Sequence, residues 1–296
     1  MKKVRVTTTY AAASTTEELN LEFYQTYDPY FLYSRASSLL MAMDQPATER
    51  RRLAKLPVPR DIKKHLAALG ADIYFTEMQQ TEAFFALLFS AFQDLPHWVY
   101  LTEYKSNDLR AMIDSFVHHK RLDGTYMSEK SERELIHHGV YFGSIPQDVA
   151  TASRWNENLD NILWLIRRTG ERFVQSSEYN SYKHGVRVMA GPSYISFGLS
   201  GGTTAMRHAS DHSVSHLQTV STGPNVKEIR RETVHFSPVE SWHHIAYLAR
   251  MAATMQAVRL AALDQTANPP LIELFLTLDR DGLELMGRRV RFTIGA

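Results

Sequence analysis

A change in hydrophobic periodicity divides this chain. Apolar residues recur at helical spacing through residues 14–185, and glycine, serine, threonine and strand-like alternation replace that pattern over residues 186–236. The clearest helical segment covers residues 154–168, with charged residues on the opposite face. We therefore predict a mainly α (α+β) fold, a helical bundle with a short antiparallel β insertion. The apolar face of this segment consists of Trp155, Leu159, Ile162, Leu163 and Ile166.

Start and stop signals divide the helical part into segments. Ser14-Thr15-Thr16-Glu17 matches a capping box, in which the first hydroxyl and the glutamate cap a helix start. The run after Glu77 has too many apolar residues for one narrow stripe, so we expect a central helix there. Glycines are taken as helix ends. We expect helices over residues 14–43, 60–70, 77–92, 96–119 and 131–139.

The segment after Arg154 is predicted to form a helical hairpin. Gly170 interrupts the periodic pattern, and a second helix from Glu171 would end at Gly185, where a left-handed cap suits glycine. A connection this short places two helices antiparallel. We therefore expect the two helices to pack through the apolar face that begins at Trp155.

The rest of the chain predicts strands on either side of a long helix. Residues 186–236 indicate two to four antiparallel strands. Ser237-Pro238-Val239-Glu240 combines a cap, a first-turn proline and a capping-box glutamate, which predicts a helix over residues 237–265. Asp281-Gly282 lies between two apolar runs in residues 271–296, which favours a C-terminal hairpin, although a helix remains an alternative for the first run. We expect residues 1–296 to form a single compact domain.

Composition narrows the classes of function. The formal charge of +1 gives no global attraction to nucleic acid or to an anionic membrane, so any such binding needs a local patch. The absence of cysteine removes disulfides, thiolate metal sites and cysteine nucleophiles, and suits a reducing compartment. The first residues lack the apolar core of a signal peptide. We expect a cytoplasmic protein with no membrane span and no bound cofactor.

The most specific local motif is Tyr179-Asn180-Ser181-Tyr182-Lys183-His184 at a predicted helix end. Asn180 and His184 lie one helical turn apart, so an amide and an imidazole share a face and can hold a phosphate or ribose edge. The segment resembles the motif of HEPN-type helical domains, in which an Arg, a polar residue, three further positions and a His serve RNA cleavage. Tyr179 stands where the family has its arginine. The resemblance implies an RNA- or nucleotide-binding protein whose catalysis is degenerate, with Asn180 and His184 as catalytic residues and Lys183 and Arg187 as binding residues.

A carboxylate–histidine metal enzyme is one alternative. Two Glu-x-x-His units, Glu134…His137 and Glu240…His243, imitate the order found in di-iron bundles, and Glu77, Glu82, Glu103, Glu157 and Glu178 are candidate lone carboxylates. His208, His212 and His216 share one face in either a helix or a strand and suit zinc, but their serine-rich surroundings also suit a solvated loop. About one Glu-x-x-His unit is expected by chance. We therefore assign no metal ligand.

Two further features complete the search for sites. Gly198-Leu199-Ser200-Gly201-Gly202 has the spelling of a nucleophile elbow, but the elbow needs a parallel sheet before it, so we predict a hairpin turn. Residues 50–64 contain seven basic residues against one acid, Asp61, which suits phosphate contacts or a solvated helix face. A non-enzymatic interaction module, in which the β insertion contacts a protein partner or a second copy, remains a rival function.

His184 separates the functional interpretation from a structural one. We expect His184→Gln to lower the affinity for RNA or a nucleotide tenfold or more, about 1.4 kcal/mol, with little change in melting temperature. A helix-capping role alone would cost at most about 1 kcal/mol of stability and leave the affinity unchanged. A binding titration and a melting curve on the same variant measure both quantities.

Overall fold

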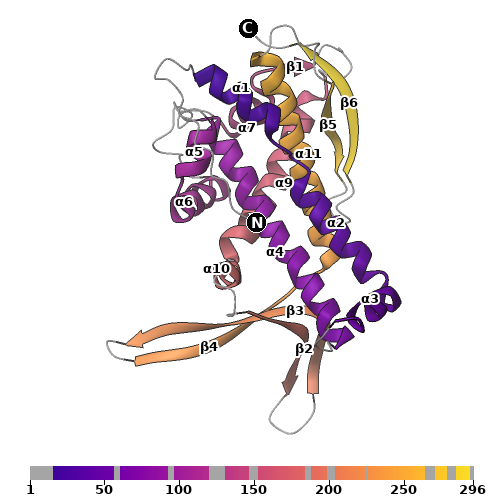
Figure 1. Ribbon diagram of the computed structural model, residues 1–296. Coiled ribbons are helices and arrows are strands. Elements are labelled where there is room, and N and C mark those ends of the chain that lie inside the picture. The colour runs from indigo at the N-terminus through magenta and orange to yellow at the C-terminus, as the bar shows by residue number, and fades with distance from the viewer. Residues whose placement is uncertain are drawn as a thin grey trace, which may run out of the picture.

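The computed structural model shows helices gathered around one long helix, with two small antiparallel sheets at the edges of the bundle (Figure 1). It describes residues 16–56, 61–92, 97–119, 131–146, 153–183, 188–198, 204–223, 226–263, 271–278 and 285–293. The predicted fold class, a mainly α bundle with a short antiparallel β insertion, is confirmed. The helices are α1 (Thr16–Thr26), α2 (Phe31–Met43), α3 (Pro46–Leu53), α4 (Ile62–Ser90), α5 (His97–Glu103), α6 (Ser106–Val117), α7 (Glu132–Tyr141), α9 (Trp155–Gln175), α10 (Ser177–Lys183) and α11 (Pro238–Leu263).

Helix α4 is the centre of the bundle. It contacts α2, α5, α6, α7, α9, α10 and α11, and nearly every side chain from Ile73 to Ser90 is buried. A helix that is apolar all around must be covered on all sides, so the central helix predicted after Glu77 is confirmed. The core that surrounds it includes Phe75, Met78, Phe84, Phe85, Leu88, Phe89, Ile113, Ile136, Ile162, Ile166, Leu248 and Met255.

Three glycines that were predicted to end helices lie inside helices instead. Helix α4 runs through Gly70, α7 runs through Gly139, and α9 runs through Gly170 to Gln175. At each position a Cβ atom would meet a neighbouring element: it would lie 2.9 Å from His212 Nδ1 at Gly70, 2.5 Å from Leu88 Cδ1 at Gly139 and 2.7 Å from Val117 Cγ2 at Gly170. These glycines therefore allow close packing between elements, and the predicted helix ends were wrong.

The helical hairpin predicted around Gly170 is also wrong. One continuous helix, α9, replaces it, and the short α10 follows after Ser176. The predicted apolar face is nevertheless buried: Ile162 and Ile166 are fully buried, Leu159 and Leu163 are nearly so, and Trp155 is partly buried against the core. The helical periodicity of this face was predicted correctly, but Gly170 does not end the helix.

Two predicted helices are divided in the structure. The segment expected to run to Met43 is interrupted between α1 and α2, where Pro29 has no N–H to donate and Asp28 Oδ1 accepts a bond from Tyr30 N at 2.9 Å. The segment expected over residues 96–119 forms α5 and α6. The capping box of α7 is present, with Ser131 Oγ and the Glu134 carboxylate accepting reciprocal backbone bonds. The capping residues Ser14 and Thr15 lie outside the described residues.

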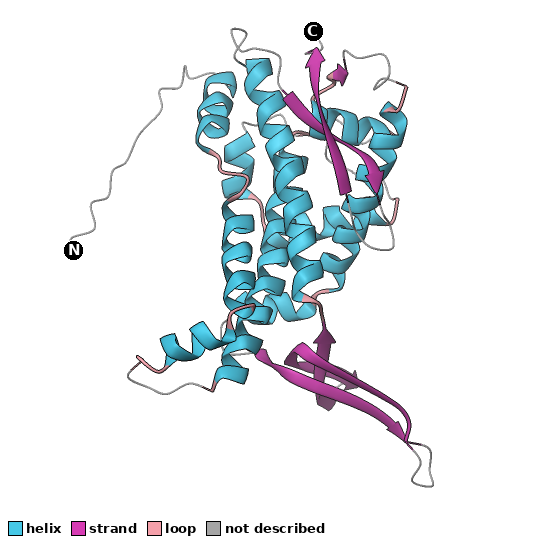
Figure 2. Ribbon diagram, turned by 90° about the vertical axis from the view of Figure 1, so that its right-hand side faces the viewer, coloured by secondary structure: helices cyan, strands magenta, loops and turns pink. Residues whose placement is uncertain are grey.

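The β insertion forms a three-stranded antiparallel sheet in the order β2-β3-β4. Its strands are β2 (Val188–Gly198), β3 (Thr204–Gly223) and β4 (Val226–His235). The first part of β3 pairs with β2 and the last part pairs with β4, and only residues 213–216 pair on both sides. Because the two pairings share so short a stretch, the strands diverge and extend away from the helical bundle (Figure 2).

Helix α11 begins at Pro238, as predicted, and Ser237 Oγ accepts the Glu240 N–H at 3.3 Å. The C-terminal hairpin is confirmed as β5 (Leu271–Leu278) and β6 (Leu285–Thr293), which pair antiparallel. A short strand, β1 (Ile145–Pro146), adds to β6 and was not predicted. Within the described ranges, no helix combines the length and the apolarity that a membrane crossing requires.

Gly170→Ala tests the packing role of this glycine. In an open helix position the change would stabilise the protein by about 1 kcal/mol, because alanine is the better helix former. Here the added methyl group would meet Val117 and Phe85, so we expect the free energy of unfolding to fall by roughly 1–3 kcal/mol. The exposed neighbour Glu171→Ala is the control in the same denaturant titration. A stabilised Gly170→Ala variant would contradict the packing role.

Candidate functional site

Helix α4 has carboxylates among its buried apolar residues, and the deepest of them is Glu77. Its side chain is fully buried between α9 and α11. Glu77 Oε1 lies 2.7 Å from Nδ1 of the fully buried His244, and Glu77 Oε2 accepts a bond from Arg172 Nη2 at 3.0 Å. Burial alone would raise the pKa of Glu77, but the bond from His244 and the positive charge of Arg172 outweigh it and lower this pKa from its ordinary value. Glu77 is therefore a charged anchor for two helices.

Arg172 extends this anchor towards the surface. Its second terminal nitrogen, Nη1, donates to Glu240 Oε1 at 2.9 Å, so one guanidinium joins α4, α9 and the first turn of α11. Arg168 Nη2 lies 3.6 Å from the same Glu240 oxygen. The planar fork of arginine suits two carboxylates at once. The guanidinium is thus held on both sides by acidic groups.

A second buried carboxylate, Glu82, holds α10 on α4. Lys183 Nζ donates to both of its oxygens, at 2.9 and 2.8 Å, Tyr179 Oη donates to Oε2 at 2.7 Å, and Ser106 Oγ donates to Oε1 at 3.0 Å. Lys183 Nζ also lies 4.4 Å from the centre of the Tyr179 ring. Burial would raise the pKa of Glu82, but the bonds from Lys183 and Tyr179 lower it. This cluster fixes the short helix in place.

Two further side chains of α10, Glu178 and Tyr182, also contact α4. Tyr74 Oη donates a short bond to Glu178, which is buried, and burial together with this carboxylate raises the pKa of the Tyr74 hydroxyl. Tyr182 Oη donates to Asp72 Oδ1 at 3.0 Å, and the Tyr182 ring stacks on Phe75 with centroids 3.9 Å apart. The tyrosines of the motif therefore attach the helix to the bundle.

The structure places one of the predicted site side chains. Lys183 is engaged with Glu82, so its charge is neutralised within the protein. Asn180 lies in α10, but its side chain is outside the described residues, as are His184 and Arg187. The roles assigned to these four residues stay predictions. We did not predict from the sequence that α10 packs on Tyr74 and Glu82. A signal was present, because an acidic side chain within an apolar helical run requires a cation or a hydrogen-bond donor beside it.

The other sequence motifs have structural partners. Glu134 belongs to the capping box of α7, and Glu240 bonds to Arg172. His216, in β3, is buried and its Nε2 lies 3.2 Å from Ser177 Oγ. No group of three or more histidine, aspartate or glutamate side chains that could hold a metal ion occurs within the part of the chain that the structure describes. The strand after Gly198 is antiparallel to the one before it, whereas a nucleophile elbow needs a parallel sheet and then a helix; residues 199–203 themselves lie outside the described residues.

A cavity of about 340 Å³ lies where α4, α9, α10, α11 and the end of β4 meet. Its aromatic wall is a stacked pair, Tyr74 and Phe236, with ring centroids 4.8 Å apart. The charged lining combines two carboxylates, Glu178 and Glu240, with the guanidinium of Arg172. Glu240 and Glu77 already bind that guanidinium. A phosphate group would meet more negative than positive charge here. The complete lining is Tyr74, Arg172, Gln175, Ser176, Glu178, Val234, His235, Phe236 and Glu240.

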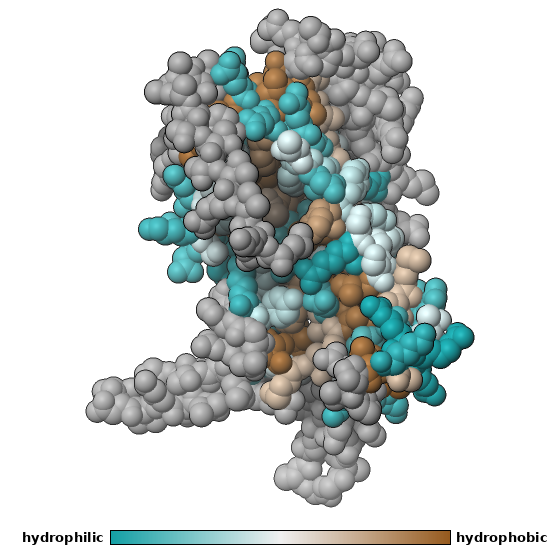
Figure 3. All heavy atoms as spheres, viewed as in Figure 1, coloured by the Kyte–Doolittle hydropathy of each residue, from teal (hydrophilic) through white to brown (hydrophobic). Residues whose placement is uncertain are grey.

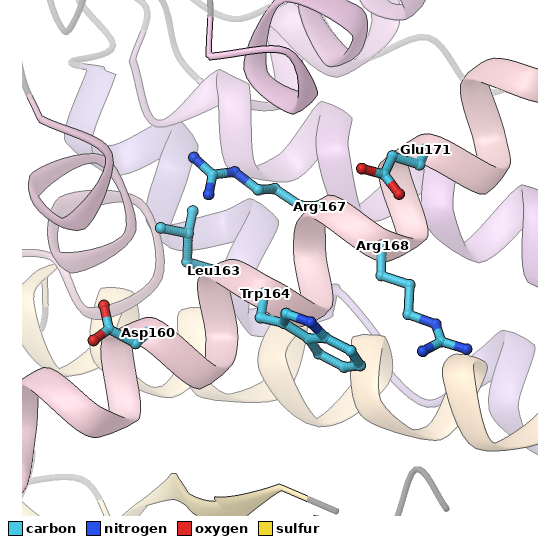
Figure 4. A pocket seen from close by; sticks show the side chains of 6 residues that line it. All are labelled: Asp160, Leu163, Trp164, Arg167, Arg168 and Glu171. Carbon is cyan, nitrogen blue, oxygen red and sulfur yellow. The ribbon is translucent and has the colours of Figure 1, made fainter. Parts of the chain in front are cut away.

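A hollow of about 560 Å³ follows the outer face of α9 (Figure 4). All six side chains that line it come from this one helix. Its cations are already engaged: Arg167 forms a close ion pair with Glu132, and the Arg168 guanidinium lies over the Trp164 ring at 5.3 Å. The charges of this hollow are thus balanced within the protein. The lining residues are Asp160, Leu163, Trp164, Arg167, Arg168 and Glu171.

Among the residues whose exposure the structure describes, the densest group of exposed cations lies on α3, on the turn after it and on the start of α4. Glu49 and Leu53 are buried and face inward, so the arginines between them point to the solvent. The two acids nearby are engaged. Glu49 Oε2 lies 3.0 Å from His65 Nε2 and Glu49 Oε1 lies 3.6 Å from Arg52 Nη1, and Asp61 caps α4 by accepting from Lys63 N at 2.8 Å. Figure 3 shows hydrophilic residues gathered over α3. We call this region the cationic surface; it consists of Arg50, Arg51, Arg52, Lys55, Lys63 and Lys64, all exposed.

Searches of known protein families, of curated proteins and of solved structures found no match to this chain. Its function must therefore be inferred from its own residues. Among the described regions, the cationic surface and the cavity beside Arg172 differ in charge, and charge decides which of them suits a nucleic acid.

Glu77→Gln tests the buried anchor. The change leaves Arg172 and His244 without their buried anion, so we expect the free energy of unfolding to fall by about 3 kcal/mol near neutral pH. Because the pKa of native Glu77 is lowered from its ordinary value of 4.5, its stabilisation is present above that value and is lost as the pH falls through the native pKa. Denaturant titrations should therefore show the two proteins converging below pH 4.5. Glu157→Gln, which breaks the exposed pair with Arg154, is the control; an equal loss there would contradict the anchor role.

Proposed function

We propose that the protein binds RNA, and that the cationic surface on α3 and the start of α4 makes the phosphate contacts. The observation that carries this proposal is the set of six exposed cations with the neighbouring acids turned inward or engaged. Phosphate contacts by lysine and arginine supply most of the sequence-independent affinity of nucleic-acid-binding proteins. The net charge of +1 does not oppose this, because binding depends on the local patch.

The charges elsewhere support this placement of the phosphates. Lys183, which the HEPN resemblance suggests as a binding residue, is neutralised by Glu82, and Arg172 is held between Glu77 and Glu240. A phosphate at either place would have to displace a carboxylate from a charge-assisted bond. Arg52 shares this cost, because its Nη1 lies 3.6 Å from Glu49 Oε1. The other five side chains of the cationic surface are exposed to solvent, so they can approach an RNA backbone more readily.

The α10 motif adds a second contact to this proposal. His184 and Arg187 follow α10 in the chain, and hydrogen bonds at Glu82, Glu178 and Tyr182 hold that helix on α4. A rigid support of this kind lets a following polar segment contact a ribose or phosphate in a constant geometry. The His184→Gln measurement tests this contact separately from the cationic surface.

Charge reversal tests the cationic surface. We expect the combined variant Arg50→Glu, Arg51→Glu and Lys55→Glu to weaken binding of a labelled single-stranded RNA at least tenfold, because three phosphate contacts become repulsive. The dependence of log affinity on log salt should become shallower by about 2, since each contact to a single strand contributes roughly 0.7. Fluorescence anisotropy between about 50 and 200 mM salt measures both quantities.

The matched control reverses exposed cations on other parts of the bundle, in the combined variant Lys105→Glu, Arg133→Glu and Arg154→Glu. The overall charge then changes equally, but the cationic surface is intact. An equal loss of affinity in both variants would show that net charge alone attracts RNA. Absence of RNA binding by the unchanged protein at the lowest salt concentration would refute the proposed function.

A further inference from the structure

A groove of about 620 Å³ lies between α2 and α11. Its floor and walls are mostly aromatic, and one arginine stands at its side. Figure 1 shows α2 and α11 next to each other, and the two helices are in contact. The groove is lined by Tyr30, Tyr33, Trp242, His243, Ala246, Tyr247 and Arg250.

The rings in this groove form an unbroken row. Tyr30 and Tyr33 have centroids 6.3 Å apart, Tyr33 and Trp242 are 5.6 Å apart, and Trp242 and His243 are 5.1 Å apart. His243 and Tyr247 continue the row, stacked at 6.3 Å with an interplanar angle of 19°. Each ring is thus in contact distance of the next. Tyr30 is exposed and Tyr33, Trp242 and His243 are partly exposed, whereas Tyr247 is buried, so the first four rings can contact a ligand.

The row is held in place by the bundle, not by solvent-exposed loops. A small core of Ala36, Ile73 and Ile245 lies beneath it, with Tyr33 and Trp242 packed against that core. Trp242 Nε1 donates to Ser37 Oγ at 2.9 Å, which fixes the orientation of the indole. Rigid aromatic side chains lose little conformational entropy when they bind a ligand. The groove is therefore preorganised for flat ligands.

The groove and the cationic surface are connected by a single helix. Tyr30 precedes α2 and α3 follows its end, so the 13 residues of α2 place the Tyr30 end of the groove about 20 Å from α3 along the helix. Trp242, bonded to Ser37 in the middle of α2, lies closer to α3. Arg250 adds positive charge at the groove itself. An elongated anion with flat, apolar groups is complementary to both regions at once, whereas an apolar peptide would gain nothing from the cations.

We propose that this aromatic groove binds the unpaired bases of single-stranded RNA, while the cationic surface holds the phosphates of the same strand. This inference rests on the proposed function and specifies its ligand. Bases stack on aromatic side chains at about 1–3 kcal/mol per base, and every base has a face that can stack. In a duplex these faces are occupied by neighbouring base pairs, so the groove selects single strands.

Removal of the exposed ring of Tyr30 and the half-buried ring of His243 tests the proposal. We expect the combined variant Tyr30→Ala and His243→Ala to lower the affinity for a single-stranded RNA of about 16 nucleotides at least tenfold, with the affinity for duplex RNA unchanged. Tyr30 is 41 % exposed, so its removal leaves the core intact. The matched control is Phe31→Ala: this ring is 65 % exposed beside Tyr30 but does not line the groove, and its loss should change neither affinity. Single-stranded DNA of the same sequence shows whether the 2′-hydroxyl contributes.

Tryptophan fluorescence provides the second measurement. Stacking of a base on Trp242 should quench its emission, and Trp242→Phe should remove that quenching from the signal of the four tryptophans. Equal affinity of the double variant and the unchanged protein for single strands, with no quenching, would overturn the groove proposal while RNA binding by the cationic surface stands. A change of oligomeric state in the double variant, with RNA affinity unaffected, would overturn it in favour of protein docking. Failure of the unchanged protein to bind either form of RNA would refute the proposed function itself.

Discussion

Burial of charged carboxylates along α4 is the constraint on which the bundle depends. A carboxylate in an apolar interior is costly unless cations and hydrogen-bond donors surround it. Glu77 meets this requirement through Arg172 and His244, and Glu82 meets it through Lys183, Tyr179 and Ser106. Each carboxylate therefore selects which helices can lie against α4. Apolar burial drives the association, and the ion pairs determine its register.

The same constraint distinguishes two sets of described cations. Arg172 and Lys183 form ion pairs with the buried acids Glu77 and Glu82, so their role is to stabilise the fold. The six exposed cations of the cationic surface outnumber the two acids beside them, Glu49 and Asp61, so the surface there is positive. This division is the reason that the proposed RNA contacts lie on α3 and not at the cavity beside Arg172. The proposed base contacts lie in the aromatic groove along α2.

A glycine in this chain can either end a helix or allow close packing inside one, and the sequence pattern alone does not distinguish these two roles. A glycine after an apolar run is typical of a helix end, because it adopts a left-handed cap at low cost. At Gly70, Gly139 and Gly170 the helix continues. The missing side chain makes room for β3 at Gly70, for α4 at Gly139, and for α4 and α6 at Gly170. The true left-handed cap of α7 is Phe142, with φ of 51°. Only the position of the neighbouring elements distinguishes a glycine that ends a helix from one that allows close packing.

The sequence by itself determined the class of fold, the apolar face of α9, the start of α11 and the two β regions, because each depends on local periodicity and capping chemistry. It also indicated the basic stretch on α3, since a run of charges shows directly in the residues. Only the tertiary structure decided that Lys183 lies on Glu82, that Arg172 joins Glu77 to Glu240, and that Tyr33 meets Trp242. These partners are separated by many residues, and no local pattern specifies which distant side chain will supply the charge or ring that a buried group requires.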